Sequence, residues 1–220
     1  MVQTIELRGK DAWPALDVEC RPRVLEEVAE AEQVTLRHFP DAAVRQSAAI
    51  IQAGGNCGLW PRMFARLGFT VHTFEPESTN FACLVQNCVE HLGGRIVPYM
   101  MALADEAGWG SFQVNPTNVG AHYLGGPGGE RVRQTTIDSL VMPYERIDLI
   151  QLDVEGAEVI ALQGASAVIG HHRPLLWLED KGLTHKVSGH SSAESWLHER
   201  WPKYRVVERI RKDILLRWGG

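Results

Sequence analysis

The sequence predicts an α/β fold in which a mostly parallel sheet of seven strands carries helices on both faces and ends in an antiparallel hairpin. Three observations predict it. β-rich apolar runs alternate with segments whose apolar residues recur at helical spacing. A glycine-rich turn, residues 54–58, joins the first such strand to its helix. Two further β-rich runs, Tyr204–Ile210 and Asp213–Trp218, are separated by only two residues, as in a hairpin.

The central motif runs from Ala48 to Pro76. An apolar strand, Ala48–Ile51, leads into the glycine turn, and a helix with Leu59, Met63, Phe64 and Leu67 on one face follows. Glycines allow positive φ and let a ligand approach the main chain at a helix N-terminus. The next strand, Thr70–Phe74, ends at Glu75, an acid placed to accept hydrogen bonds from both ribose hydroxyls of a nucleoside. A close helix–strand packing turn is the alternative explanation.

The glycine spacing excludes the usual phosphate-binding motifs. Asn56 replaces the second glycine of G-x-G-x-x-G, and no G-x-x-x-x-G-K-[S/T] occurs. The pattern therefore favours a nucleoside cofactor without a pyrophosphate, of which S-adenosylmethionine is the common example.

Composition limits the class of protein further. The chain has 220 residues, 45% of them hydrophobic, which is enough for one substantial core. We expect residues 46–220 to form one domain and residues 1–45 an extension with a helix that packs on it. The net charge of −5 predicts no general attraction to nucleic acid or membranes. We expect a small-molecule or glycan substrate, and the oligomeric state stays open.

No signal peptide or membrane span is visible, since the first residues are polar and no apolar run reaches about 18 residues. We therefore expect a cytoplasmic protein. No C-x-x-C pair occurs, and we expect reduced cysteines that serve packing, namely Cys20, Cys57, Cys83 and Cys88.

The remaining pattern predicts further elements. Before the motif we expect a strand at Val2–Leu7, a break at Trp13-Pro14 and a surface helix from Arg23 to Phe39. After it we expect a helix capped by Ser78 or Thr79, followed by these strands or β-rich runs: Ile96–Leu103, Gly110–Val114, Val132–Ile137, Ile147–Asp153 and Pro174–Asp180. Helices are expected through Val159–Leu162 and Ser192–Trp201, a loop at Asn115–Gly120, and a flexible link at Gly125–Gly129 that borders the site.

In a parallel sheet, ligands bind beyond the carboxyl ends of the strands. The glycine turn, Glu75, Met101-Ala102, Asp153 and Glu179 all fall at the carboxyl ends of predicted strands. We expect them to lie along one edge of the sheet and to face one cleft.

From Ala48 to Asp180 the chain resembles the FkbM-type branch of S-adenosylmethionine-dependent methyltransferases. The resemblance rests on the glycine turn, on Phe74-Glu75-Pro76, and above all on Ile150–Glu158 with Leu162–Ala165. It implies a Rossmann-like class I methyltransferase fold and S-adenosylmethionine as cofactor, with S-adenosylhomocysteine as product. It implies methyl transfer, often to an oxygen of a sugar or natural product. The residues that we expect to bind the cofactor are Gln52, Gly54, Gly55, Asn56, Gly58, Glu75, Pro76, Met101, Ala102 and Asp153.

Two positions depart from the family pattern. Gln52 stands where an acid usually precedes the glycine turn, so contact with the cofactor's amino group is weakened or passes through water. Gln151 stands where a lysine commonly precedes the Asp-Val-Glu-Gly run, which removes that cation from any role in substrate binding. N-methylation, or cofactor binding without turnover, are the alternative functions.

The catalytic demand is modest, because a sulfonium is already electrophilic and catalysis consists mainly of alignment and exclusion of water. A hydroxyl acceptor still needs a group that takes its proton. Asp153 is our first candidate, with cofactor binding or helix capping as its alternative. Glu179 is the second, and its alternatives are binding a cation or substrate, or stabilising the loop that carries Lys181 and His185. His122 is the third unless it is an exposed loop histidine.

The two glutamates of the Ile150–Glu158 motif can be explained without a catalytic role. Glu155 and Glu158 are expected in the first turn of a helix, where the dipole favours carboxylates whatever the function. Asp153 and Glu179 have the oxygen ligands that Mg²⁺ prefers, but we expect no metal.

Overall fold

The computed structural model describes residues 5–8, 11–14, 21–115, 122–140 and 146–220. The chain forms two compact units. The first comprises Met1–Met100 with Asn115–Gly120, and the second comprises Met101–Val114 with Ala121–Gly220. The predicted loop Asn115–Gly120 lies outside the described residues except for Asn115.

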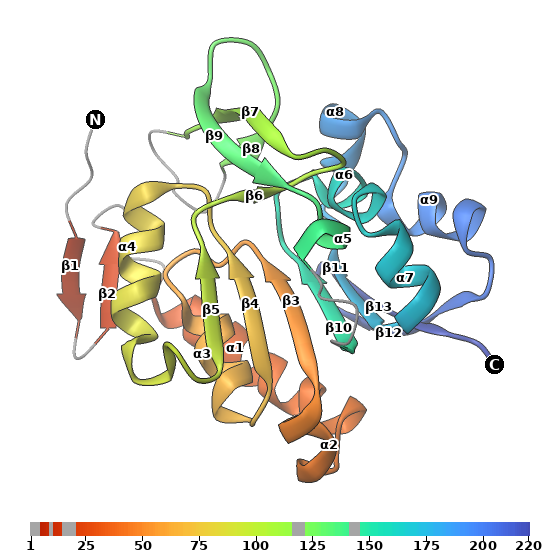
Figure 1. The fold of residues 1–220 in the computed structure, drawn as a ribbon, viewed down its shortest axis with the longest axis horizontal. Helices are drawn as coiled ribbons and strands as arrows, with labels where there is room; N and C mark the ends of the chain where they lie inside the picture. Colours follow the sequence, from red (N-terminus) through yellow and green to blue (C-terminus); the bar gives the residue numbers. More distant parts are fainter. Residues whose placement is uncertain (1–4, 9–10, 15–20, 116–121, 141–145) are drawn as a thin grey trace. The chain divides into compact units, whose positions relative to one another are not determined.

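The first unit contains three parallel strands that lie side by side in Figure 1, β3 (Ala49–Ala53), β4 (Thr70–Phe74) and β5 (Ile96–Tyr99). Every residue of β3 is buried, which explains its continuous apolar run. The helical elements of this unit are α1 (Arg21–His38), α2 (Ala42–Ser47), α3 (Leu59–Arg66), α4 (Ser78–Asn87) and the 3₁₀ turn η2 (Val89–His91).

The expected break at Trp13-Pro14 is wrong. These residues end strand β2 (Asp11–Pro14), which pairs antiparallel with β1 (Ile5–Arg8). The side-chain amide of Asn87 on α4 accepts from the Ala12 N–H at 2.6 Å and donates to the Ala12 carbonyl at 2.7 Å. Asn87 thus bonds β2 as a neighbouring strand would, and Trp13 is 1% exposed in the core beneath it. A side chain far along the sequence supplies this pairing, so local pattern does not reveal it.

Two further expectations in the first unit need correction. Helix α4 is capped by Glu77, whose carboxylate accepts from the Asn80 N–H at 2.7 Å, and not by Ser78 or Thr79. The run Ile96–Leu103 is not one strand. It divides into β5 and the short strand β6 (Ala102–Leu103), which belongs to a different sheet in the second unit.

The second unit contains the parallel strands β10 (Ile147–Leu152) and β11 (Leu175–Glu179) and the predicted hairpin β12 (Tyr204–Ile210) and β13 (Asp213–Trp218). Strand β13 pairs antiparallel with both β11 and β12. Helices of this unit are α5 (Ile137–Leu140), α6 (Glu158–Gln163), α7 (Ser166–His172), α8 (Thr184–Ser188) and α9 (Ala193–Arg200). The order of the seven strands is β12-β13-β11-β10-β3-β4-β5, which confirms the predicted fold class.

The second unit also contains a separate sheet of four strands, which the sequence did not predict. It has the order β6-β9-β7-β8, with β7 (Gly108–Gln113), β8 (Tyr123–Leu124) and β9 (Glu130–Thr135), and Figure 1 shows β7, β8 and β9 in green. One face of this sheet buries Phe112 and Leu124 in a cluster with Ala157. The expected β-rich run to Ile137 ends at Thr135, because Ile137 begins α5.

The glycine-rich segment between β8 and β9 is a bonded turn and not a free link. The Ser111 hydroxyl donates to the Gly126 carbonyl at 2.7 Å, and the Gln113 amide donates to the carbonyls of Gly125 and Pro127. Gly129 lies so close to β7 that an added Cβ would be 2.5 Å from the Phe112 oxygen. Close contact with β7 therefore requires glycine at this position.

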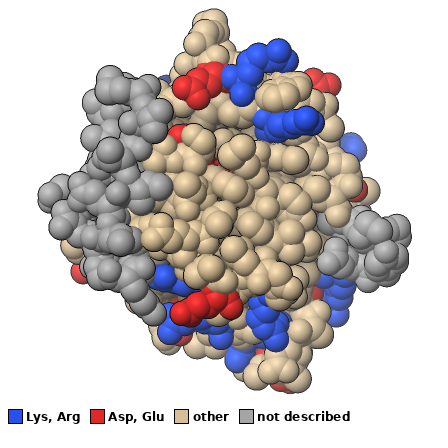
Figure 2. Space-filling model, turned by 60° about the vertical axis from the view of Figure 1, so that its left-hand side comes forward, with Lys and Arg blue, Asp and Glu red and all other residues tan. Residues whose placement is uncertain are grey.

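The structure also shows where charged side chains gather and how the cysteines are placed. On the face shown in Figure 2, charged side chains gather along the upper and lower margins and leave a broad area between them nearly free of charge. Cys57, Cys83 and Cys88 are free and buried, and burial raises the pKa of the Cys88 thiol to about 12. Among the described residues, no helix is long and apolar enough to cross a membrane.

Candidate functional site

The predicted glycine turn connects β3 to α3 and contains three residues with positive φ, which are Gly54 (80°), Asn56 (43°) and Gly58 (85°). Gly55 has a different reason to be glycine. A Cβ there would lie 2.5 Å from Leu84 Cδ1 and 2.8 Å from Thr73 Oγ1. Close packing on α4 and unusual backbone geometry therefore both act in this turn, so the packing explanation holds for part of it.

Glu75 joins the end of β4 to the glycine turn. Its Oε2 accepts from the Asn56 N–H at 2.8 Å, and its Oε1 accepts from the Glu77 N–H at 2.9 Å. The residue is only 5% exposed. Burial raises the pKa of Glu75 to about 7, although the two N–H bonds oppose the shift. The Asn80 side chain donates a third hydrogen bond to this carboxylate, which leaves room for one further donor.

Gln52 is bonded within the protein. Its side-chain oxygen accepts from the Thr73 hydroxyl, and its amide nitrogen donates to the Ala53 carbonyl at 3.2 Å. It is 1% exposed. Pro76 is partly buried directly after Glu75. Met101 and Ala102 belong to the second unit, where Ala102 pairs with Gln134 of β9.

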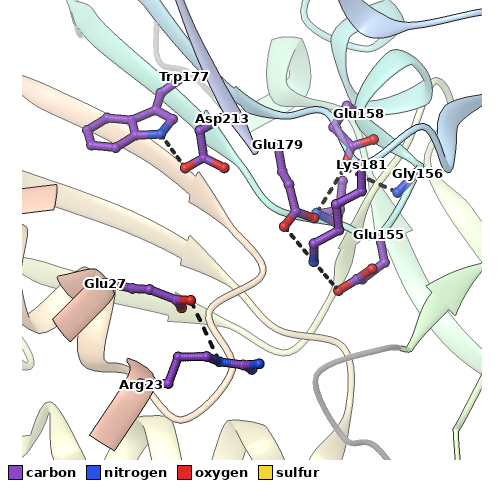
Figure 3. Close-up of polar contacts among 10 residues, drawn as sticks. Arg23, Glu27, Glu155, Gly156, Glu158, Trp177, Glu179, Lys181 and Asp213 are labelled. Carbon is purple, nitrogen blue, oxygen red and sulfur yellow. Dashed lines mark hydrogen bonds and ion pairs between the residues drawn. The ribbon is translucent and has the colours of Figure 1, made fainter. Parts of the chain in front are cut away.

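In the second unit, β10 ends at Leu152 and a tight turn precedes α6. Glu158 organises this turn, because its Oε1 accepts from the N–H groups of Val154 and Gly156, both at 3.2 Å, and Figure 3 shows the contact with Gly156. Burial raises the pKa of Glu158 to about 7. Glu158 begins α6 as expected, but Glu155 does not lie in a helix, since it has a φ of 52° in the turn before it.

Three carboxylates gather after β10 and β11. Asp153, Glu155 and Glu179 each offer an oxygen within 4.8 Å of the others. Lys181 lies among them, with its Nζ 2.5 Å from Glu179 Oε1 and 2.9 Å from Glu155 Oε1, as Figure 3 shows. We call these four residues the Asp153 cluster. The sequence places Asp153 and Glu179 together correctly within this unit.

Within the Asp153 cluster, burial and neighbouring charges shift the pKa values of Glu179, Glu155 and Lys181. Burial, followed by the negative charge of Asp153 and a hydrogen bond with it, raises the pKa of Glu179 far above that of an ordinary carboxyl. Burial also raises the pKa of Glu155, which the ammonium of Lys181 opposes. Burial alone would lower the pKa of Lys181, but the carboxylates, Asp153 first, raise it. At neutral pH, Glu179 therefore holds a proton, and Lys181 stays a cation beside the carboxylates.

The alternative role of Glu179, stabilising the loop that carries Lys181, is confirmed by the ion pair between the two side chains. Lys181 lies two residues beyond Glu179, and its side chain is only 24% exposed. The three carboxylates have the spacing of cation ligands, and the Lys181 ammonium supplies a positive charge among them. The expectation that no metal is used stays a prediction.

His122 is buried, at 8% exposure, so the alternative of an exposed loop histidine is wrong. Its ring meets Phe112 edge-on with centroids 5.8 Å apart. Its proposed role as a base stays a prediction. The glycine turn with Glu75 and the Asp153 cluster belong to different units, and the expected single cleft also stays a prediction.

Comparisons with solved structures identify the fold. A methyltransferase FkbM from Methylobacillus flagellatus KT matches with a TM-score of 0.57 and 18% identity over 79% of this chain. This chain spans 44% of that protein, less than half of its length. A putative caffeoyl-CoA O-methyltransferase from Staphylococcus aureus matches with a TM-score of 0.51 and 13% identity, covering 94% of this chain and 92% of the other. The architecture is the Rossmann-like fold of class I methyltransferases.

A comparison with curated proteins finds no match. The sequence model of the methyltransferase FkbM domain matches residues 52–204. This match covers more than half of the chain and includes the glycine turn, Glu75 and the whole Asp153 cluster. The protein therefore belongs to the FkbM family of methyltransferases, which use a cofactor of the S-adenosylmethionine type.

Proposed function

We propose that the protein transfers a methyl group from S-adenosylmethionine to a hydroxyl group of a sugar or natural product. The observation that carries the proposal is the Asp153 cluster, in which the Lys181 ammonium lies among three carboxylates and burial beside Asp153 raises the pKa of Glu179. Family membership supports the transfer itself. The choice of oxygen as acceptor rests on the presence of a carboxylate base.

The glycine turn and Glu75 fit the adenosine part of the cofactor. Glu75 is a buried acid whose ionisation costs free energy, as its pKa of about 7 shows. Ribose hydroxyls that donate to it would stabilise the carboxylate. The positive φ values at Gly54 and Gly58 allow the tight turn that leads into α3. S-adenosylmethionine, when bound, supplies an electrophilic methyl group.

On the acceptor side, Asp153 takes the hydroxyl proton as the new C–O bond forms. The Lys181 ammonium supplies positive charge to the cluster, and the proton on Glu179 avoids a second negative charge beside Asp153. Glu158 fixes the turn that follows Asp153 through the amides of Val154 and Gly156. The turn thereby holds the base in place without contributing to proton transfer.

Two measurements test the proposal. Calorimetry should show that S-adenosylmethionine and S-adenosylhomocysteine both bind. A methyl-release assay should then show turnover on members of a panel of sugars, glycans and phenolic natural products, and none on matched amines. Activity should survive EDTA, because Lys181 supplies the positive charge. Binding without turnover on any acceptor would favour a cofactor-binding protein, and turnover only on amines would favour N-methylation.

A further inference from the structure

The outer face of the four-stranded sheet carries exposed side chains that methyl transfer does not explain. Trp109 of β7 lies directly opposite Arg133 of β9, and Ser111 lies opposite Arg131. Since side chains alternate along a strand, Trp109, Arg131 and Arg133 share one face, while Phe112 packs into the core on the other. We call these three residues the Trp109 platform. Trp109 is 54% exposed, and both arginines are exposed.

Both guanidinium groups stack on the indole. The Cζ atoms of Arg131 and Arg133 lie 5.3 Å and 5.0 Å from the centroid of the Trp109 ring. Stacking uses the flat face of a guanidinium and leaves its N–H edge available for a bidentate bond to a carboxylate. Within the described part of the chain, no ion pair joins either guanidinium to a carboxylate. Two ordered cations therefore face solvent on a protein whose net charge is −5.

The dimensions and chemistry of the platform favour one kind of partner. The Cα atoms of Arg131 and Arg133 are two strand residues apart, about 7 Å, so their long side chains can reach carboxylates on neighbouring sugar units. The exposed part of the indole offers an apolar surface to the C–H face of a pyranose ring. A nucleic acid fits less well, because neutralising two phosphates gains little affinity for an acidic protein.

We propose that the Trp109 platform binds an acidic sugar chain whose rings carry carboxylates, with Arg131 and Arg133 binding those carboxylates and Trp109 contacting a ring. This inference rests on the proposed function and names the class of its acceptor. The sheet's inner face packs with Ala157 and Val154, beside Asp153 in sequence. The platform therefore belongs to the same unit as the proposed base and holds the acceptor chain on that unit.

Calorimetry on the full chain tests the proposal with hexagalacturonate as probe, neutral maltohexaose as the uncharged control and a single-stranded RNA hexamer as the rival polyanion. We expect hexagalacturonate alone to bind, more weakly as salt rises. Trp109→Ala and Arg133→Gln should each weaken binding by about tenfold or more. Arg66→Gln, which removes an exposed arginine of α3 in the other unit, should change nothing.

Each other outcome has a definite meaning. No binding of hexagalacturonate by a protein that binds S-adenosylmethionine overturns the platform and leaves the proposed function intact. Failure to bind S-adenosylmethionine, with hexagalacturonate still bound, overturns the proposed function and not the platform. Equal affinity for maltohexaose or for RNA overturns the inference. Full affinity in the Trp109 and Arg133 variants does so too, and circular dichroism checks that these variants are folded.

Discussion

At the scale of single residues, Glu75 is the buried acid whose ionised form a bound ligand would stabilise. It is buried, it already orders the glycine turn through Asn56, and burial places its pKa at about 7. A ribose hydroxyl that donates to this carboxylate would stabilise its charge. Cofactor binding should therefore favour the ionised form of Glu75 and depend on pH.

We expect Glu75→Gln to weaken S-adenosylmethionine binding by at least about tenfold, because charge-assisted hydrogen bonds contribute about 1.5 to 3 kcal/mol. Wild-type affinity should fall about tenfold from about pH 8 to about pH 6, as Glu75 takes up a proton. The variant should lose this dependence. Calorimetry at several pH values measures both effects, with the exposed Glu90→Gln as control. Unchanged affinity in a folded Glu75→Gln protein would refute the assignment.

Asp153 makes a separate prediction about turnover. Asp153→Asn keeps the size of the side chain but removes the base, so kcat should drop by about 100-fold or more while the protein stays folded. Asp105→Asn, an exposed acid of the same unit, should leave kcat unchanged. Steady-state kinetics on an accepted sugar distinguishes the two variants. Normal turnover by Asp153→Asn would end its candidacy as the base.

At the scale of elements, the turn between β10 and α6 depends on one close approach. Gly156 has a φ of 100°, and a Cβ there would lie 2.9 Å from both the carbonyl carbon and oxygen of Leu183. Neither backbone atom can move without shifting the start of α8. The glycine of the family signature is therefore required by geometry and packing together.

We expect Gly156→Ala to destabilise the protein by about 2 to 4 kcal/mol, from backbone strain and overpacking. The matched control is Gly170→Ala in α7, where nothing lies within 4 Å of the new Cβ. That change should stabilise the protein by about 0.5 to 1 kcal/mol, because alanine favours a helix. Urea unfolding measures both. Equal stability of the two variants would show that the turn tolerates a side chain.

Prediction from sequence succeeded where local pattern decides the structure. The bounds of β4, β12 and β13 were read exactly, because strong β propensity and a two-residue turn fix them. It failed for β2, which needs the side-chain amide of Asn87. It also failed for the four-stranded sheet, because its paired strands lie far apart in the sequence and are partly polar. Of the candidate site, the acids were found, but the position of Lys181 depends on how the chain folds after β11.

At the scale of the whole molecule, the buried acids link stability to pH. Glu75 and Glu158 have pKa values of about 7 in the folded protein and near 4.5 when exposed. The folded state therefore binds more protons than the unfolded state between these values. The stability that this contributes is fully present below about pH 4.5 and is lost as the pH rises through about 7.

We expect Glu75 and Glu158 together to make the ligand-free protein more stable at about pH 5.5 than at about pH 8.5 by about 4 kcal/mol, or about 8 to 16 °C in Tm. Scanning calorimetry across this range measures the change. Glu75→Gln combined with Glu158→Gln should reduce the dependence, of which Glu179 keeps a part, and the exposed Glu90→Gln should not. A wild-type Tm that rises with pH over this range would contradict the buried-acid account.

The place of β13 between β11 and β12 has a consequence for biosynthesis. Residues 213–218 must insert beside a strand made some forty residues earlier, and β12 then closes the edge. Until that hairpin has been made and has folded, the backbone of β11 has an open side that another nascent chain can occupy. Pairing of β13 with β11 is thus the step that covers this edge of the second unit.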